Sequence, residues 1–211
     1  MKVLVFTDIH GNLNVLHMLR QKAVEENADL VLCAGDFTVM GQQQSAILSR
    51  LNLFRVPVFL IHGNHENEEE LVRELPNYPN ITFLHKKIIQ RDGWWFGSYA
   101  TSGMGEQYPD QEHWVAEHGQ EIAAAAATGK LVWLDHPPPA NTSCDELAEE
   151  WHVGSISLRK LIEKHQPAYV FCGHLHETFG REDMVKNTIV INPGPKGKVL
   201  ELEPRGCPKP N

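Results

Sequence analysis

The sequence has few cysteines, no long apolar run and no segment typical of export. Its 211 residues include only 4 Cys, widely spaced and without a Cys-x-x-Cys pair, which argues against a disulfide framework and against structural zinc. No apolar stretch approaches the roughly 20 residues that span a bilayer. The first residues also lack the longer apolar region of a secretory signal. We therefore expect no membrane association and a cytoplasmic location.

Basic residues are also in short supply. The chain has 19 Lys and Arg against 27 Asp and Glu, which gives a formal charge of −8. Such a protein lacks the broad positive field that attracts a polyanion, although bound divalent cations would offset part of the charge locally. Long duplex DNA or RNA is therefore a poor candidate for a substrate.

What the chain does have is a regular alternation of apolar strand-like runs and amphipathic helices in its first third. The expected strands are Lys2–Phe6, Leu30–Ala34 and Pro57–Ile61, and the expected helices are Asn12–Asn27, Gln42–Leu53 and Glu68–Leu75. The strands are continuous apolar runs, as in parallel sheets covered on both faces. This part of the sequence predicts an α/β fold.

The rest of the chain mixes strand types. Short runs between Ile81 and Gly97 predict an antiparallel meander, and Asp110–Thr128 predicts one helix that ends before Gly129. Further expected elements are the strands Leu131–Leu134, Ala168–Cys172, Thr188–Ile191 and Lys198–Leu202 and the helix Ser155–His165. We expect a single domain over residues 1–203, followed by a flexible Pro-rich tail over 204–211.

Polar side chains of the metal-binding type follow directly after the expected strands. They are Asp8 with His10, Asp36, Asn64 with His65 and Glu66, Asp135 with His136, and His174 with His176. Because the carboxyl ends of strands in an α/β sheet meet at one edge, we expect these side chains to converge. Carboxylate, imidazole and amide oxygen without thiolate suit Mn²⁺, Fe, Zn²⁺ or Co²⁺, whereas Ca²⁺ prefers more oxygen ligands.

The spacing of two pairs supports this prediction. Asp8 and His10 are two positions apart, as are His174 and His176, so in an extended segment both members of a pair point to the same side. A single Asp-x-His or Gly-Asp is weak evidence for metal binding. The whole set, in this order and always after a strand, is hard to explain as surface and turn chemistry.

The other polar candidates leave alternatives open. Glu66 either orients His65 or caps a helix, and Asp135 either orients His136 or is a surface acid. His62 is a candidate for a supporting role, and His85 and His152 either line a substrate pocket or lie on the surface. We expect the remaining helical histidines on solvated faces; they are His17, His113, His118 and His165.

Short motifs carry a resemblance to a known family. Asp-Ile-His-Gly-Asn at 8–12, Gly-Asp at 35–36 and Gly-Asn-His-Glu at 63–66 are similar to those of calcineurin-like metallophosphoesterases. His-Pro at 136–137 and Gly-His-Leu-His at 173–176 complete the set, and Asn-Pro-Gly at 192–194 resembles a segment of small bacterial and archaeal members. The resemblance spans about residues 3–202.

The resemblance implies a fold and a site. The fold is an α/β/β/α sandwich of two stacked mixed β-sheets flanked by helices. The site holds two divalent metal ions, for which Mn²⁺ is expected and Fe, Zn²⁺, Co²⁺ or Ni²⁺ are compatible. By motif, Asp8, His10 and His176 hold one ion, Asn64, His136 and His174 hold the other, Asp36 bridges both, and His65 occupies the position of the catalytic histidine.

The implied activity is hydrolysis of phosphodiester or phosphomonoester bonds by a metal-bridging hydroxide. Position 39 holds Val39 where many relatives carry an acid, and His65 is present where some diester-specific relatives carry Cys. The expected substrate is a small phosphorylated molecule, for example one of nucleotide type, selected by the polar segments 99–112 and 137–154. The alternatives are a nuclease or protein phosphatase and a non-enzymatic scaffold. The filled ligand positions favour an enzyme.

Overall fold

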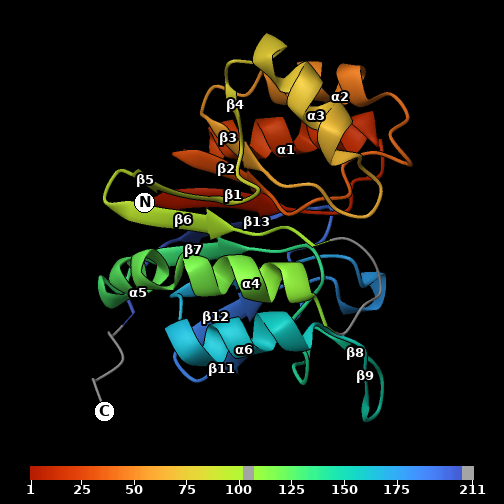
Figure 1. The fold of residues 1–211 in the computed structure, drawn as a ribbon. Coiled ribbons are helices and arrows are strands. Elements are labelled where there is room, and N and C mark those ends of the chain that lie inside the picture. Colours follow the sequence, from red (N-terminus) through yellow and green to blue (C-terminus); the bar gives the residue numbers. More distant parts are fainter. Residues whose placement is uncertain (102–106, 206–211) are drawn as a thin grey trace.

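Two mixed β-sheets stack face to face, and helices cover both outer faces (Figure 1). The computed structural model describes residues 1–101 and 107–205. The expected α/β/β/α sandwich is thereby confirmed. Of the expected flexible tail, 206–211 lie outside the described residues, as do 102–106 of the expected substrate loop.

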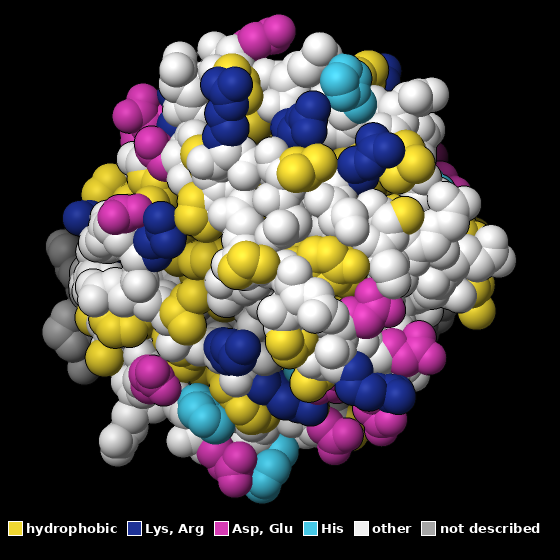
Figure 2. Space-filling view, turned by 90° about the horizontal axis from the view of Figure 1, so that it is seen from above, with side chains coloured by type: hydrophobic (Ala, Val, Ile, Leu, Met, Phe, Trp, Pro, Cys, Tyr) yellow, Lys and Arg dark blue, Asp and Glu magenta, His cyan; other side chains and the backbone are white. Residues whose placement is uncertain are grey.

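The first sheet contains the N-terminal strands in the order β13-β1-β2-β3-β4, with β1 to β4 parallel and β13 antiparallel to β1. Its strands are β1 (Lys2–Phe6), β2 (Leu30–Cys33), β3 (Val58–Leu60), β4 (Ile81–Phe83) and β13 (Lys198–Glu201). The helices on its outer face are α1 (Leu13–Glu25), α2 (Gln44–Leu51) and α3 (Glu68–Glu74), followed by the short 3-10 helix η1 (Leu75–Asn77). Basic side chains on this helical face are interspersed with apolar and neutral ones (Figure 2).

The second sheet has the order β11-β12-β10-β7-β6-β5, in which β6, β7, β10 and β12 are parallel and the two edge strands are antiparallel. Its strands are β5 (Lys87–Arg91), β6 (Trp94–Ser98), β7 (Leu131–Leu134), β10 (Tyr169–Phe171), β11 (Glu182–Val185) and β12 (Thr188–Ile191). The remaining elements are α4 (Pro109–Glu117), α5 (Gly119–Ala127), α6 (Ile156–His165), the hairpin β8 (Glu146–Ala148) with β9 (Trp151–His152), and the 3-10 helix η2 (His176–Thr178).

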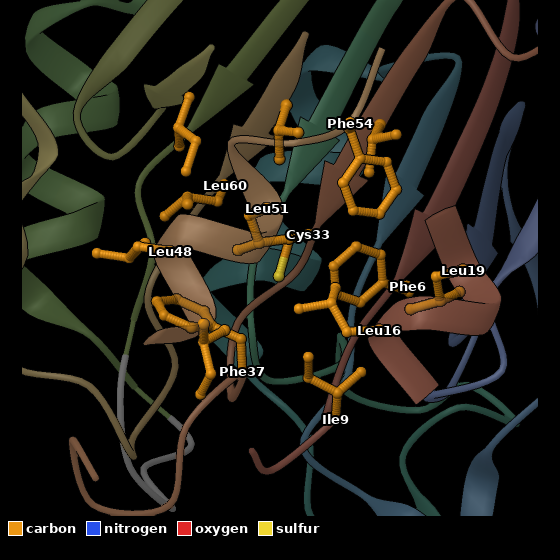
Figure 3. Packing of buried hydrophobic residues seen from close by; sticks show 14 of the residues in the cluster. Phe6, Ile9, Leu16, Leu19, Cys33, Phe37, Leu48, Leu51, Phe54 and Leu60 are labelled. Atoms are coloured by element: carbon orange, nitrogen blue, oxygen red, sulfur yellow. The ribbon is translucent and has the colours of Figure 1, made fainter. Parts of the chain in front are cut away.

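Alternation of side chains along the strands builds two apolar layers. In β1, Leu4 and Phe6 face the helices, whereas Val3 and Val5 face the other sheet. Between the sheets, Phe59 of β3 meets Phe96 of β6 edge to face, with ring centroids 5.3 Å apart. On the helical side, Phe6 packs with Leu16 of α1 and Leu48 of α2 (Figure 3). Burial of each such side chain contributes roughly 1.5–3 kcal/mol, which explains why these strands are apolar throughout.

The expected single helix over Asp110–Thr128 was wrong, because the chain breaks it into α4 and α5 at His118. Gly119 is a poor helix residue, and the Nδ1–H of His118 donates to the Trp114 carbonyl at 2.9 Å, which satisfies an acceptor of the last turn. Strand β11 was not expected, since its Glu-Asp-Met-Val sequence lies at a sheet edge where little is buried. Within residues 1–101 and 107–205, none of the helices is long and apolar enough to cross a membrane.

Candidate metal centre

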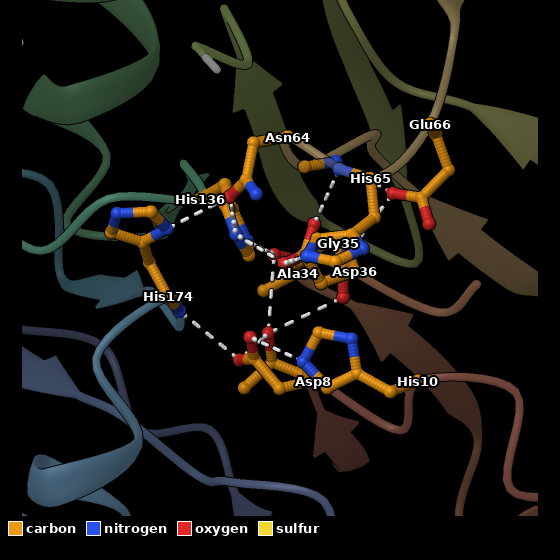
Figure 4. Close-up of polar contacts among 12 residues, drawn as sticks. Asp8, His10, Ala34, Gly35, Asp36, Asn64, His65, Glu66, His136 and His174 are labelled. Atoms are coloured by element: carbon orange, nitrogen blue, oxygen red, sulfur yellow. Dashed lines mark hydrogen bonds and ion pairs between the residues drawn. The ribbon is translucent and has the colours of Figure 1, made fainter. Parts of the chain in front are cut away.

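The loops after β1, β2, β3, β7 and β10 meet at the carboxyl edge of the two sheets. These loops carry the residues predicted to hold metal, and Figure 4 shows most of them pointing toward one another. The residues brought together are Asp8, His10, Asp36, Asn64, His136, His174 and His176. Their convergence follows from the parallel order of the strands, since parallel strands end at the same edge.

The first group of potential ligands contains Asp8, His10 and His176. Nε2 of His10 lies 3.0 Å from Nε2 of His176, and Asp8 Oδ1 lies 3.7 Å and 3.6 Å from these two nitrogens. Asp8 Oδ1 is buried and has no hydrogen-bond partner among the described residues. A buried carboxylate oxygen without a donor is costly, and a cation among these three atoms would remove that cost.

The second group contains Asn64, His136 and His174. The Asn64 Oδ1 atom lies 2.9 Å from His174 Nδ1 and 3.2 Å from His136 Nε2. His136 is fully buried, and its ring is approached edge-on by that of His174 with centroids 5.2 Å apart. Three ligand atoms therefore surround a second point at the same sheet edge.

Asp36 connects the two groups. Its Oδ2 lies 3.3 Å from His136 Nε2, and its carboxylate also lies within 4.8 Å of ligand atoms of His10 and His65. Burial raises the pKa of Asp36, but the interactions with His136 and His65 outweigh this effect and bring the pKa to about 2. An ionised carboxylate that lies between the two groups can be a ligand for a cation at each of them.

Hydrogen bonds to the backbone fix the orientation of two imidazoles. His10 Nδ1 lies 3.3 Å from the Thr38 carbonyl, and His136 Nδ1 lies 2.8 Å from the Ala34 carbonyl. A carbonyl can only accept, so Nδ1 carries a hydrogen in both rings and Nε2 is the nitrogen that faces the site. This is the tautomer that a metal ion requires, and the donor set therefore fits divalent cations.

A family model described as calcineurin-like phosphoesterase matches residues 1–178. The chain belongs to the calcineurin-like phosphoesterase family. It is therefore a metal-dependent phosphoesterase, and its family implies divalent metal ions at the cluster described above. The resemblance read from the motifs is confirmed.

The chain is also similar to relatives in sequence and to solved structures in fold. An uncharacterized protein of Methanocaldococcus jannaschii is 31% identical over 205 residues, which cover 93% of this chain and 89% of the relative. A probable glycerophosphodiester phosphodiesterase of Arcobacter nitrofigilis is 25% identical over 185 residues, which cover 80% of this chain and 64% of the relative. The crystal structure of TT1561 of Thermus thermophilus shares the fold, with a TM-score of 0.71, 20% identity, and coverage of 92% of this chain and 88% of that one.

The backbone of the phosphoesterase site differs from the expected extended segments. Asp8, His10, Asp36 and His174 have φ of 53°, 42°, 49° and 70°, in the left-handed region. Their side chains still converge, but through tight turns rather than through the two-residue period of a strand. Positive φ at a residue other than Gly costs roughly 1–3 kcal/mol and is typical of functional sites, where the surrounding structure holds the strain.

His136 and Asp36 form a close ion pair in the phosphoesterase site. Burial lowers the pKa of His136, but the interaction with the Asp36 carboxylate and the nearby Asp8 raises it to about 9. A metal ion at His136 Nε2 must displace this proton. Metal binding through His136 would therefore be coupled to proton release.

His65 lies at the exposed side of the ligand groups. Its Nδ1 accepts a hydrogen bond from the Met40 backbone N–H at 3.2 Å, so the hydrogen of the neutral ring is on Nε2. Nε2 lies 3.8 Å from Asp36 Oδ2, and the His65 and His10 ring centroids are 4.8 Å apart. The backbone of Met40, which the sequence did not single out, therefore turns a hydrogen-bond donor of His65 toward the site.

Glu66 neither orients His65 nor caps an exposed helix. Its carboxylate is buried and accepts from the backbone N–H groups of Asp36, Gly63 and Thr38 at 3.0, 2.8 and 2.8 Å, and from the Thr38 hydroxyl at 2.7 Å. Burial raises the pKa of Glu66 despite these donors. One side chain thus joins the loops after β2 and β3, which carry Asp36 and Asn64.

Asp135 is fully buried, so the expectation of a surface acid was wrong. Its Oδ1 accepts from the Thr101 N–H at 3.0 Å, the Thr101 hydroxyl at 2.9 Å and the His136 N–H at 2.9 Å, and its Oδ2 accepts from the Gln111 amide. Burial raises the pKa of Asp135 to about 6. Asp135 therefore positions the backbone of His136, whereas the Ala34 carbonyl sets the tautomer of its ring.

The remaining histidines divide between surface and interior. His17 and His113 are exposed as expected, and His118 is half-buried against Trp114 at a centroid distance of 4.1 Å. His165 is only 5% exposed, because it faces the sheet at the end of α6 rather than solvent. His152 Nδ1 pairs with buried Asp145 at 2.8 Å.

Proposed function

We propose that this phosphoesterase hydrolyses phosphodiester or phosphomonoester bonds at a dinuclear metal centre. Asp8, His10 and His176 would hold one cation, and Asn64, His136 and His174 the other, with Asp36 shared by both. The observation that carries the proposal is the pair of ligand groups joined by Asp36, one of which contains the unpaired buried Oδ1 of Asp8.

Two divalent cations held by these residues would activate a water molecule as the nucleophile near neutral pH and would neutralise charge on the phosphoryl oxygens. The protein holds the ligands in place before substrate arrives. The Thr38 and Ala34 carbonyls fix the rings of His10 and His136, and the Glu66 carboxylate ties the Asp36 and Gly63 backbones together. This preorganisation limits the rearrangement needed during the reaction.

His65 completes the proposed mechanism. Its Nε2–H points toward the site because Met40 N–H occupies Nδ1. In this position the Nε2–H of His65 donates a hydrogen bond to the leaving oxygen and stabilises the negative charge that develops there as the phosphorus–oxygen bond breaks. Its side chain is 24% exposed, so water can reach this side of the site and protonate the departing alkoxide.

A small phosphorylated molecule is the proposed substrate, with a nucleotide-type phosphodiester as the first choice. The relative in Arcobacter nitrofigilis is named as a probable glycerophosphodiester phosphodiesterase, which supports diester hydrolysis. The formal charge of −8 argues against a long nucleic acid. Mn²⁺ is the proposed metal on the basis of the oxygen and imidazole ligands, and we propose a cytoplasmic location.

The test is hydrolysis of a panel of chromogenic monoesters and diesters by protein that has been stripped with a chelator and reloaded with Mn²⁺, Zn²⁺ or Mg²⁺. We expect turnover only after reloading, with bis(p-nitrophenyl) phosphate among the substrates. Two equivalents of metal per chain should be required for full activity. Absence of hydrolysis with every metal would favour the scaffold alternative.

A further inference from the structure

A polar pocket of about 340 Å³ lies beside the metal centre, and none of the steps above uses it. One wall is His62, which is two residues before Asn64 and hence within about 7 Å of it along the chain. Another wall is Thr101, which donates to the Asp135 carboxylate next to His136. A molecule with its phosphoryl group at the metal centre can therefore extend into this pocket.

Two buried imidazoles in the pocket each have one ring nitrogen that makes no hydrogen bond to the described residues. His62 and His85 are both 6% exposed, and their ring centroids are 4.8 Å apart. Nε2 of each ring has no hydrogen-bond partner within residues 1–101 and 107–205; Glu68 Oε1 lies 3.4 Å from Nε2 of His85 without forming a hydrogen bond to it. A buried polar atom without a hydrogen-bond partner destabilises the folded protein, so a ligand that satisfies both nitrogens recovers that free energy.

The backbone defines what each nitrogen offers. His62 Nδ1 lies 3.1 Å from the Gly63 carbonyl, which can only accept, so Nδ1 holds the hydrogen and Nε2 is an acceptor. His85 Nδ1 accepts from the Ala100 N–H at 3.0 Å, so Nε2 of His85 holds the hydrogen and is a donor. Burial lowers the pKa of His85 to about 3, and its ring is neutral at physiological pH.

The same tautomers argue against a third metal ion in this pocket. A nitrogen of each ring and a Glu68 oxygen lie within 4.8 Å of one another, which resembles a set of metal ligands. Coordination through His85 Nε2 needs a lone pair on that atom, but the lone pair of this ring is committed to Ala100 at Nδ1. Glu68 also pairs with Lys86 at 3.7 Å, which leaves its charge balanced without a cation.

We propose that this pocket binds a hydroxyl group on the alcohol portion of the substrate, such as a sugar or polyol hydroxyl; this inference rests on the function proposed above. A single hydroxyl oxygen accepts from His85 Nε2–H and donates to His62 Nε2. The two ring centroids are 4.8 Å apart, which is close enough for one oxygen to reach a nitrogen of each ring at an ordinary hydrogen-bond distance of about 2.8 Å. The Tyr99 ring, 5.1 Å from that of His85, supplies an apolar wall for the carbon skeleton.

The experiment compares two diesters that differ by one hydroxyl. They are the p-nitrophenyl esters of thymidine monophosphate and of its analogue that lacks the free sugar hydroxyl. We expect the native Mn²⁺-loaded protein to have a kcat/KM about tenfold higher for the hydroxylated ester, the usual value of one good hydrogen-bonded pair. Equal kcat/KM for the two esters would overturn the hydroxyl site.

A variant locates the effect in the pocket. In His85→Asn the amide oxygen takes the place of Nδ1 and keeps the Ala100 bond, while the Nε2–H donor is removed. We expect the preference for the hydroxylated ester to fall to about onefold, and His113→Asn on the surface of α4 to retain the native preference. Persistence of the preference in His85→Asn, or loss of one metal equivalent from that variant, would contradict the proposal.

Bis(p-nitrophenyl) phosphate carries no hydroxyl, so its hydrolysis tests the phosphoesterase function independently of the hydroxyl site. If the native protein hydrolyses it but does not distinguish the thymidine esters, the hydroxyl site alone is refuted. If the native protein hydrolyses neither this diester nor the thymidine esters with any metal, the phosphoesterase function fails, and the role of the pocket fails with it.

Discussion

The buried Oδ1 of Asp8 lies 3.6 Å from Nε2 of His176, although one residue follows the first strand and the other begins η2 near the end of the chain. The two side chains come from the first and the second sheet and approach each other at the edge where the ligands meet. Without a cation, this carboxylate oxygen has no donor among the residues that the structure describes. We therefore expect metal binding at this centre to stabilise the fold as well as to support the reaction.

Removal of metal should lower stability for this reason. A ligand that binds only the folded state, at a hundred times its Kd, contributes about 2.7 kcal/mol. We expect chelated protein to melt several degrees below the Mn²⁺-loaded protein, and re-addition of Mn²⁺ to restore the melting temperature. Identical melting curves for the two forms, measured by calorimetry, would contradict stabilisation of the fold by bound metal.

Asp36→Asn should abolish metal binding and activity together. The substitution removes the charge of the carboxylate that lies between the two ligand groups, and it leaves His136 without its ion-pair partner at 3.3 Å. We expect metal content below one equivalent per chain and a loss of activity of at least a hundredfold. Full activity with two bound metal ions in this variant would refute the bridging role.

His65→Ala should separate metal binding from stabilisation of the leaving group. His65 is not among the residues expected to hold metal, so the variant should retain both ions. Removal of one preorganised hydrogen-bond donor costs about 10²–10³-fold in kcat, and the loss matters most when the leaving alcohol is a poor one. We expect a large drop in kcat for alkyl esters and a much smaller drop for p-nitrophenyl esters; equal drops would argue against a hydrogen bond to the leaving oxygen.

Glu66→Gln tests the buried carboxylate that joins two ligand loops. Its oxygens accept from three backbone N–H groups and one hydroxyl, and an amide NH₂ in place of one oxygen would face donors instead. We expect a loss of about 2–4 kcal/mol in the free energy of unfolding and weaker metal binding. Glu69→Gln, on the exposed side of α3, is the matched control and should leave both quantities unchanged.

The sequence predicted the alternation of buried strands and helices, and the sheet edge at which the site lies, because both depend on local patterns; the two stacked sheets were implied by the family resemblance. Continuous apolar runs such as Leu30–Cys33 reveal a buried strand, and polar residues directly after such runs reveal the sheet edge. The edge strand Glu182–Val185 escaped prediction, since an exposed edge has no such pattern.

The supports of the site could not be predicted for a different reason. Met40 N–H, the Thr38 and Ala34 carbonyls, and the Thr101 donor to Asp135 act through backbone or through contacts between segments far apart in the sequence. The burial of His165 was missed for the same reason: it lies on the buried face of α6, although the helical pattern around it indicates a solvent-exposed position.

His165 makes the stability of the fold depend on pH. Its ring is buried, its Nε2 has no partner in the part of the chain that the structure describes, and burial lowers its pKa from 6.5 to about 4. Between these values the unfolded chain binds a proton that the folded chain does not. The stabilisation is therefore complete above pH 6.5 and is lost as the pH falls toward 4.

Replacement of His165 by Leu should remove this dependence while filling a similar volume. We expect His165→Leu to be at least as stable as the native protein at neutral pH, and to lose about 1 kcal/mol less between neutral and acidic pH, a figure reduced to allow for solvent screening. Urea unfolding at several pH values measures both quantities, with His113→Leu as the exposed control. Parallel pH profiles for His165→Leu and the native protein would show that another group causes the loss of stability in acid. If the buried ring causes it, the two profiles must diverge below pH 6.5, because the folded native protein does not protonate His165 there and the unfolded chain does.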